Sequence, residues 1–264
     1  MVLTHAERLL QELGVSEPNE IDLEAIAYYV NARVRFQPLD GYDARIVGYG
    51  GNAIITVNAS GTIRRKRFSI AHELGHWHHH RGKCLVCRVD EYQPSQTLAP
   101  ERIANAYAAD LLMPNYIFQP LMRQKGKLSF KTVAALADIF TTSKTATALR
   151  LVQGDCDPAI LVCHGLKGRR WFIRAPSVPE KWFPRDELDA DSFALGVLFG
   201  KKPDDPTPRK IGADAWFDRR EAEHFDVYEQ TMRTGPDEIL TLILINDPQM
   251  IEEDDTRGFS HLRK

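Results

Sequence analysis

The sequence predicts an α+β protein, and three observations lead to this expectation. Short segments with alternating polar and apolar residues between positions 33 and 58 are typical of strands. A helical His-Glu-x-x-His pattern follows at residues 72–76. From residue 155 onward, strand-like segments are separated by turn residues. We therefore expect helices with a small antiparallel sheet in residues 1–125, a pair of helices in 126–154, and an α+β domain on an antiparallel sheet in 155–264.

Composition and charge describe an ordinary soluble protein. The 264 residues are 43% hydrophobic and 27% charged, which is usual for globular proteins. With 34 basic and 36 acidic residues the net charge is -2, so there is no overall attraction to nucleic acid or to an anionic membrane. The first residues lack the features of a signal peptide, and no apolar run is long enough to span a bilayer. We expect a cytoplasmic protein without a membrane partner.

The first elements are two helices and the small sheet. Thr4 and Glu7 have the spacing of a capping box, and Gly14 is placed to end the helix that they begin. A second helix is expected at 22–31. Strands at 33–36, 45–49 and 53–58 follow, and Gly50-Gly51-Asn52 is a good hairpin turn. Because this sheet directly precedes the His-Glu helix, we hypothesise that Ile54–Asn58 binds an extended peptide as an added strand. The alternative is that the strand only supports the helix.

The segment Phe68–His76 contains the pattern around which we interpret the chain. On a helix His72 and His76 lie one turn apart on the same face, so both imidazoles can point at one zinc ion. Glu73 lies beside them and can reach a water without being a ligand. Of the histidines that follow, only His80 lies on the ligand face, and it is too far along the helix to share a metal with His72.

Arg64-Arg65-Lys66-Arg67 is the densest basic run. A solvated helix entrance is the usual meaning of such a run. A contact with nucleic acid or with an acidic substrate is the alternative, but no aromatic residues are interleaved to favour nucleic acid.

A third ligand is needed, because catalytic zinc sites have three protein ligands and one open position. Pro100 begins and Pro114 ends a predicted helix that contains two acidic residues, Glu101 and Asp110, on opposite faces. The face of Glu101 also carries two small alanines and an asparagine that could orient a ligand, which favours Glu101. We expect Asp110 to pair with a base. The alternative is that Glu101 only favours the positive start of the helix. The residues on the favoured face are Ala104, Asn105 and Ala108.

These residues predict peptide hydrolysis. Zinc held by His72, His76 and Glu101 would lower the pKa of a water to about 7. Glu73 would then take a proton from the water and pass one to the leaving nitrogen. Nothing identifies the group that stabilises the oxyanion. Tyr107 and His79 are candidates, although Tyr107 is better suited to the core.

The chain resembles the ImmA/IrrE family of zinc metallo-endopeptidases over about residues 1–150. The resemblance rests on Arg67-Phe-Ser-Ile-Ala-His-Glu-Leu-Gly-His76 and on Glu101-x-x-Ala-Asn-x-Tyr-Ala-Ala-x-Leu-Leu-Met-Pro114. It implies a zincin-like core with Zn²⁺ as cofactor and Glu101 as third ligand. It also implies a protein substrate, a helix-turn-helix repressor whose cleavage switches on stress-response or mobile-element genes. The family often has another acidic residue at the position that Ile103 occupies here.

The resemblance also implies a helix-turn-helix-like unit after the core. Leu136, Phe140 and Leu149 are spaced as the core of two short helices, and Ser143 is a suitable N-cap. The second helix, 144–150, is poor in residues that read base edges. We interpret the unit as a packing or substrate-docking element, and direct DNA binding as the less favoured alternative.

The C-terminal part predicts strands at 159–163, 170–174, 225–232 and 239–245, a short helix at 191–199 and a mobile loop at 201–209. By resemblance, some relatives carry a sensor domain of the GAF type here. Its aromatic residues could line a ligand pocket, although an ordinary core is the more common meaning. These residues are Trp171, Trp182, Phe183, Trp216 and Phe217.

Two alternatives remain from the sequence alone. The protein could be a DNA- or protein-binding regulator with a structural zinc site, or a sensor with a degenerate peptidase core. A second zinc could be bound by Cys84 and Cys87 together with Cys156 and Cys163, but buried thiols are favoured in a reducing compartment.

Overall fold

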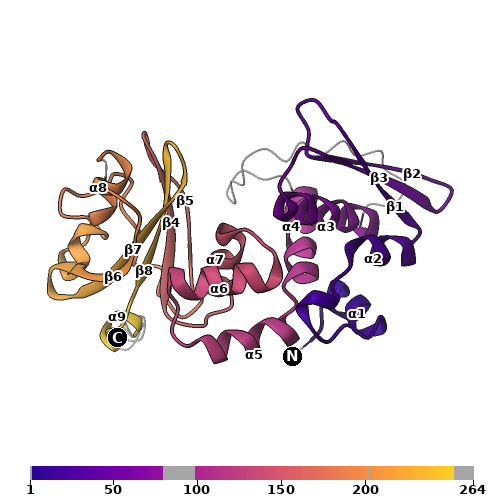
Figure 1. Cartoon of the computed structure of the whole chain (residues 1–264). Coiled ribbons are helices and arrows are strands. Elements are labelled where there is room, and N and C mark those ends of the chain that lie inside the picture. The colour runs from indigo at the N-terminus through magenta and orange to yellow at the C-terminus, as the bar shows by residue number, and fades with distance from the viewer. Residues whose placement is uncertain (1, 80–98, 201, 253–264) are drawn as a thin grey trace, which may run out of the picture. The chain divides into compact units, whose positions relative to one another are not determined.

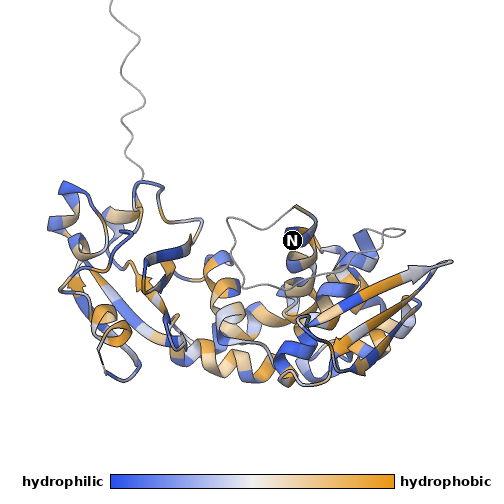
Figure 2. Cartoon of the chain, turned by 90° about the horizontal axis from the view of Figure 1, so that it is seen from above, coloured by the Kyte–Doolittle hydropathy of each residue, from blue (hydrophilic) through white to orange (hydrophobic). Residues whose placement is uncertain are grey.

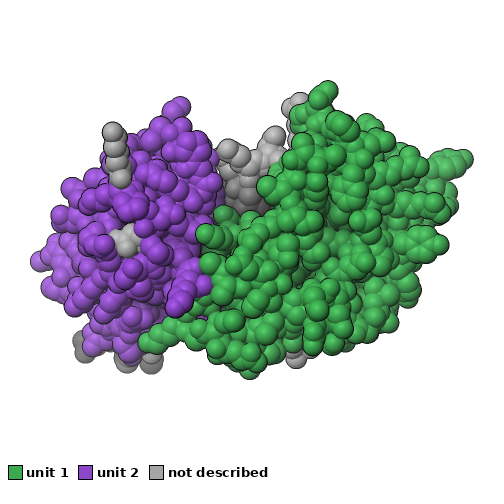
Figure 3. Space-filling model, viewed as in Figure 1, with its two compact units in different colours: residues 1–127, 132–150 green, residues 128–131, 151–264 purple. Residues whose placement is uncertain are grey.

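The structure is a computed structural model that describes residues 2–79, 99–200 and 202–252. The chain divides into two compact units, one formed by residues 1–127 and 132–150 and the other by residues 128–131 and 151–264 (Figure 3). Both units combine helices with a sheet, so the predicted α+β class is confirmed (Figure 1). No helix in the described part of the chain is long and apolar enough to cross a membrane.

The first unit begins with α1 (His5–Glu12), which has the predicted capping box. The backbone N–H of Thr4 donates to Glu7 Oε2 at 2.9 Å, and the N–H of Glu7 donates to Thr4 Oγ1 at 3.3 Å. The other carboxylate oxygen of the buried Glu7 accepts from the N–H of Asn115 at 2.7 Å. One side chain therefore caps α1 and the start of a helix more than a hundred residues later. A short 3-10 helix (Pro18–Glu20) and α2 (Leu23–Tyr29) follow, and Asp22 caps α2.

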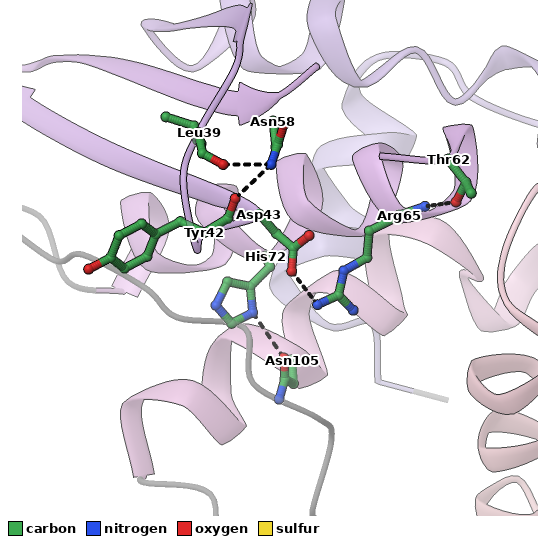
Figure 4. Close-up of polar contacts among 8 residues, drawn as sticks. All are labelled: Leu39, Tyr42, Asp43, Asn58, Thr62, Arg65, His72 and Asn105. Carbon is green, nitrogen blue, oxygen red and sulfur yellow. Dashed lines mark hydrogen bonds and ion pairs between the residues drawn. The ribbon is translucent and has the colours of Figure 1, made fainter. Parts of the chain in front are cut away.

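The small sheet contains β1 (Ala32–Gln37), β2 (Ala44–Tyr49) and β3 (Asn52–Asn58) in the order β1-β3-β2. The hairpin β2–β3 is antiparallel, but β1 pairs with β3 in parallel, so the expected all-antiparallel sheet is wrong. The cause is the connection after β1, which passes over the end of β3 rather than forming a hairpin. Asn58 secures this connection by donating to the carbonyls of Leu39 and Tyr42 at 2.9 and 3.1 Å (Figure 4).

The central position of β3 also rules out its proposed role. Every residue from Ile54 to Asn58 is paired with β1 on one side, and all but Asn58 with β2 on the other. The strand has no free edge along which a peptide could add. The hypothesis that Ile54–Asn58 binds an extended peptide is therefore wrong, and the free edges of this sheet belong to β1 and β2.

After the small sheet the described residues form α3 (Ile63–His79), α4 (Ala99–Leu112), α5 (Asn115–Lys125), α6 (Phe130–Phe140) and α7 (Lys144–Gln153). All but the start of α6 and the end of α7 belong to the first unit. The sequence pattern does not predict α5, whose Pro120 lies inside the helix. The basic run at the start of α3 is paired rather than simply solvated. Arg64 donates to Asp138 at 2.5 Å and to the carbonyl of Thr142 at 2.8 Å, and Arg65 pairs with Asp43.

The helix pair α6–α7 packs as a structural element. Ala148 and Leu149 of α7 are buried, and Arg150 donates to Asp110 Oδ1 at 2.7 Å and to the carbonyl of Met113 at 2.8 Å. Asp110 therefore pairs with a base, as expected. The burial of α7 agrees with a packing role and leaves few of its side chains exposed for reading bases.

The second unit has a five-stranded antiparallel sheet in the order β5-β4-β8-β7-β6. The strands are β4 (Ala159–Gly165), β5 (Gly168–Arg174), β6 (Asp205–Gly212), β7 (Asp226–Gly235) and β8 (Glu238–Leu244). The helices are α8 (Phe193–Leu198), α9 (Pro248–Ile251) and the 3-10 turns Ala213–Ala215 and Arg220–His224. Figure 2 shows hydrophobic residues along the strands.

The predicted loop at 201–209 is wrong over its second half, because β6 begins at Asp205. Pro206 and Pro208 suggested a loop, but β6 is an edge strand whose pairing with β7 is irregular between Asp205 and Arg209. Prolines are tolerated at such a place because no ladder hydrogen bond is needed on the open side. Four of the five C-terminal aromatic residues are buried: Trp171, Trp182, Trp216 and Phe217. Phe183 is 52% exposed, so the set is mainly core.

Candidate metal centre

The site is built where α3 packs closely against α4. A Cβ atom added to Gly75 would lie 2.9 Å from Ala104 Cα and 3.0 Å from its carbonyl oxygen. Such contacts are too short for a real side chain, so glycine is required for this approach. Ala104 and Ala108 of α4 are fully buried. The small residues on both helices therefore bring Glu101 within reach of the paired histidines.

Three side chains converge on one point, as the sequence predicts. His72 Nε2 lies 3.0 Å from His76 Nε2 and 3.1 Å from Glu101 Oε2, and Glu101 Oε1 lies 3.3 Å from His76 Nε2. Four atoms around a tetrahedral zinc at 2.0–2.1 Å are separated by about 3.3 Å. The three groups have the spacing of metal ligands, and they are the only His, Cys, Asp and Glu cluster of this kind in residues 2–79, 99–200 and 202–252.

The hydrogen bond of His72 to Asn105 fixes which nitrogen faces the cluster. His72 Nδ1 lies 2.9 Å from Asn105 Oδ1 (Figure 4). Because the amide oxygen accepts, Nδ1 carries the hydrogen and Nε2 presents its lone pair. A nitrogen that presents its lone pair to the cluster can bind a cation. A hydrogen-bond acceptor on the other ring nitrogen, as Asn105 provides here, is usual for a metal-bound histidine. The expected orienting role of Asn105 agrees with this geometry.

The charge state of Glu101 fits the same purpose. The imidazoles of His72 and His76, which lie beside the carboxylate, hold the pKa of Glu101 well below its usual range, although partial burial opposes them. The side chain is 27% exposed, so it lies at the open side of the cluster. Zinc binds both carboxylate oxygen, which is a hard ligand, and imidazole nitrogen, which is a borderline one, so an ionised carboxylate beside two imidazoles suits this metal.

Glu73 is the most unusual acidic group of the site. It is completely buried, and neither carboxylate oxygen has a hydrogen-bond partner among the residues that the structure describes. Burial raises the pKa of Glu73 to about 8, and the negative charge of Glu101 adds to the rise. A buried polar group without a partner is costly, so its presence points to function rather than to packing.

The other candidate residues lie outside this cluster. His78 and His79 are exposed, and their rings lie 5.4 and 5.8 Å from the ring of Tyr107. Tyr107 is 5% exposed, and burial raises its pKa to about 12, which agrees with a place in the core. His80, Cys84 and Cys87 lie outside the described residues. Cys156 and Cys163 form no disulfide.

Strand β2 runs alongside α3, the helix that carries His72 and His76. Asp43, just before β2, pairs with Arg65, and Gly48 near its end lies against Trp77, whose ring would be 2.8 Å from an added Cβ. From Arg65 to Trp77 the helix rises by roughly 17 Å, and from Asp43 to Gly48 the strand covers about the same length. The edge strand of the sheet therefore passes the turn that carries His72 and Glu73.

Comparisons with known proteins agree with the site. Residues 27–152 match the model of the peptidase M78 family, described as an IrrE N-terminal-like domain. Among solved structures, a Mycobacterium tuberculosis transcriptional regulator is similar, with a TM-score of 0.60 and 14% identity over 90% of this chain and 74% of that chain. This likeness shows a shared fold. No curated protein matches the chain.

Proposed function

Since residues 27–152 match the IrrE N-terminal-like model of the M78 peptidases, we propose that this protein is a zinc-dependent endopeptidase. Its substrate would be a regulatory protein of the helix-turn-helix repressor class. Cleavage would relieve repression of stress-response or mobile-element genes in the cytoplasm. The family supports a metallopeptidase that acts on regulators, and the site geometry supports the identity of the metal and the reaction.

The observation that carries the proposal is the convergence of His72, His76 and Glu101 beside the unpartnered carboxyl of Glu73. Three protein ligands are typical of catalytic zinc, whereas structural zinc is held by four. A zinc ion bound there would supply Lewis-acid chemistry and activate a water near neutral pH. A purely structural site would have no need of Glu73.

Glu73 would manage the protons of the reaction. A carboxyl whose pKa lies near the working pH can both accept and return a proton. Its burial keeps competing solvent away, and the charge of Glu101 acts on its carboxyl group. Asn105 would keep the ring of His72 in the tautomer that the metal needs.

The substrate would bind in an extended form along β2. Its outer edge is free of partners within the small sheet, and the strand passes α3. Backbone hydrogen bonds to an edge strand hold a peptide straight without requiring a particular sequence. This proposal replaces the one for Ile54–Asn58.

The test compares the wild type with Glu73→Gln, and with Glu24→Gln as a control on the exposed surface of α2. Each is incubated with zinc and with a purified helix-turn-helix repressor encoded beside the gene. Glu73→Gln should bind one zinc and keep its circular dichroism spectrum but lose cleavage by a factor of 100 or more, since general acid–base catalysis contributes about 10²–10⁴-fold. Glu24→Gln should cleave normally.

Two outcomes would contradict the proposal. Cleavage that survives Glu73→Gln would show that the hydrolytic mechanism is wrong. If no repressor is cut and zinc removal unfolds the wild type and both variants equally, the site is structural, as in a regulator that only binds DNA or protein.

A further inference from the structure

Three arginines share the outer face of the small sheet. Side chains alternate along a strand, and the inner positions Ala32, Ala44 and Ile55 are buried, whereas Arg33, Arg35 and Arg45 are exposed. Arg35 and Arg45 lie in one row, because both pair with Thr56 of β3 from opposite sides. With strands 4.7–4.9 Å apart, their backbones are about 10 Å apart, and Arg33 lies about 7 Å along β1.

In the part of the chain that the structure describes, no acidic residue pairs with these arginines. The three strands, Ala32–Gln37, Ala44–Tyr49 and Asn52–Asn58, contain no Asp or Glu. Arg64 and Arg65 of the same unit are, in contrast, bound to Asp138 and Asp43. The charge of the sheet face is therefore available to a partner, whereas that of the helix start is not.

Apolar side chains lie among the arginines. Val47 of β2 is 51% exposed and pairs with Ile54, which in turn pairs with Arg33. Tyr49, on the same face of β2, is 92% exposed. A row of arginine, isoleucine and valine offers both charge and apolar area to one partner.

We propose that this surface, the arginine face (Arg33, Arg35, Arg45, Val47 and Ile54), docks an acidic segment of the protein substrate that also carries apolar side chains. The inference rests on the proposed function, since it names a feature of the substrate. Arginine forks match carboxylates geometrically. A protein segment can also cover Val47 and Ile54, which the phosphate backbone of a nucleic acid would leave exposed. A protein partner is therefore favoured over nucleic acid.

The docking surface is separate from the catalytic groups. The candidate metal ligands belong to α3 and α4, whereas the arginine face is the side of the sheet opposite to Ala32, Ala44 and Ile55. Binding there would select the substrate and raise its local concentration beside β2 without touching the reaction. This arrangement would distinguish a folded regulator from an arbitrary extended peptide.

The test measures binding alone, in the Glu73→Gln variant, so that it does not depend on turnover. The probe is a short fluorescent peptide in which glutamate alternates with leucine and serine, and binding is followed by fluorescence anisotropy. A matched peptide with glutamine in place of glutamate and a short oligothymidylate serve as comparisons. The sheet variant is Arg33→Gln, Arg35→Gln and Arg45→Gln combined.

The control variant is Arg123→Gln, Lys125→Gln and Lys127→Gln combined, which removes the same charge from exposed positions at the end of α5 and just after it. The acidic peptide should bind the parent at least tenfold more tightly than the glutamine peptide, and added salt should weaken it. The sheet variant should lose at least tenfold in affinity, and the control less than twofold.

Equal loss in both variants, or equal binding of both peptides, would overturn the proposal. Tighter binding of the oligothymidylate with the same dependence on the arginines would also overturn it, because the surface would then serve nucleic acid. Docking that succeeds when no repressor is cleaved would separate this inference from the failure of the proposed reaction.

Discussion

His72 and Asn105 face each other from α3 and α4, with 2.9 Å between Nδ1 of the histidine and Oδ1 of the asparagine. The bond joins two helices and also sets the proton on the ring, so that Nε2 can bind a cation. It makes the arrangement of the candidate metal ligands depend on a residue that is not one of them.

Removing this partner should weaken zinc binding. Asn105→Ala leaves Nδ1 of His72 without an acceptor, and we expect zinc affinity to fall by about 10–100-fold. Asn105→Asp keeps an acceptor and should retain more of the affinity. Competition titration with a chelating dye measures the change, and Asn19→Ala, at an exposed position, is the control. Unchanged affinity in Asn105→Ala would show that the bond does not orient the ligand.

The close contact of Gly75 with Ala104 predicts a sensitive position. Gly75→Ala places a methyl group against backbone atoms at 2.9–3.0 Å, which cannot move without shifting α4. We expect the free energy of unfolding to fall by about 1–3 kcal/mol and zinc affinity to fall with it. Gly61→Ala is the control, because its new Cβ would have its nearest contact at 3.8 Å. Equal stability of the two variants in urea would refute the packing argument.

Because of His164 in β4, we expect the second unit to lose stability at acidic pH. The histidine is 1% exposed, and neither ring nitrogen has a hydrogen-bond partner. Burial lowers its pKa from 6.5 to about 4, and the charge of Arg169 adds to this. The unfolded chain therefore binds the proton more readily, and stability should be complete above pH 6.5 and decline as the pH falls toward 4.

The size of this loss of stability follows from the lowered pKa of His164. Between pH 6.5 and pH 5 the histidine should cost about 2 kcal/mol of stability. His164→Gln should show a smaller decline over the same interval, while His224→Gln, at an exposed position, should behave as the wild type. Urea unfolding followed by tryptophan fluorescence at several pH values measures the difference. Parallel pH profiles for wild type and His164→Gln would contradict the prediction.

The pair of Asp110 and Arg150 should stabilise the first unit. The two side chains are 17% and 14% exposed, and Arg150 also donates to the carbonyl of Met113. Asp110→Asn leaves a mostly buried arginine without its counter-charge, and we expect a loss of about 2–3 kcal/mol. Glu221→Gln breaks the exposed pair with Arg219 and should cost at most about 1 kcal/mol. Thermal unfolding compares them, and similar losses would argue against the role of burial.

The sequence predicts the site better than it predicts the sheets. The candidate ligands lie on two helices whose faces follow from helical spacing, so His72 and His76 could be selected from their positions. Glu101 is favoured over Asp110 by the small residues and the asparagine on its face. Gly75 could have been found as the small residue of α3 that faces the alanines of α4. The roles of these residues in catalysis remain predictions.

The pairing of strands is less visible in the sequence because it depends on distant contacts. Alternation located β1, β2 and β3, but it does not state which strands become neighbours, and the parallel pairing of β1 with β3 came from a crossover connection. For β6, the prolines favoured a loop when only local chemistry was considered. In the structure these residues form an edge strand because they pair with β7, a contact that local sequence does not reveal.

The carboxylate of Glu7 affects how far the chain can be shortened without losing stability. The segment shared with the M78 peptidase family model starts at residue 27, yet the first turn of α5 has a hydrogen-bond partner, Glu7 Oε1, from outside that segment. A fragment trimmed to the shared segment would expose the N–H of Asn115 and lose α1, whose Leu10 is fully buried. Such a fragment should therefore be less stable than one that also keeps α1 and the carboxylate of Glu7.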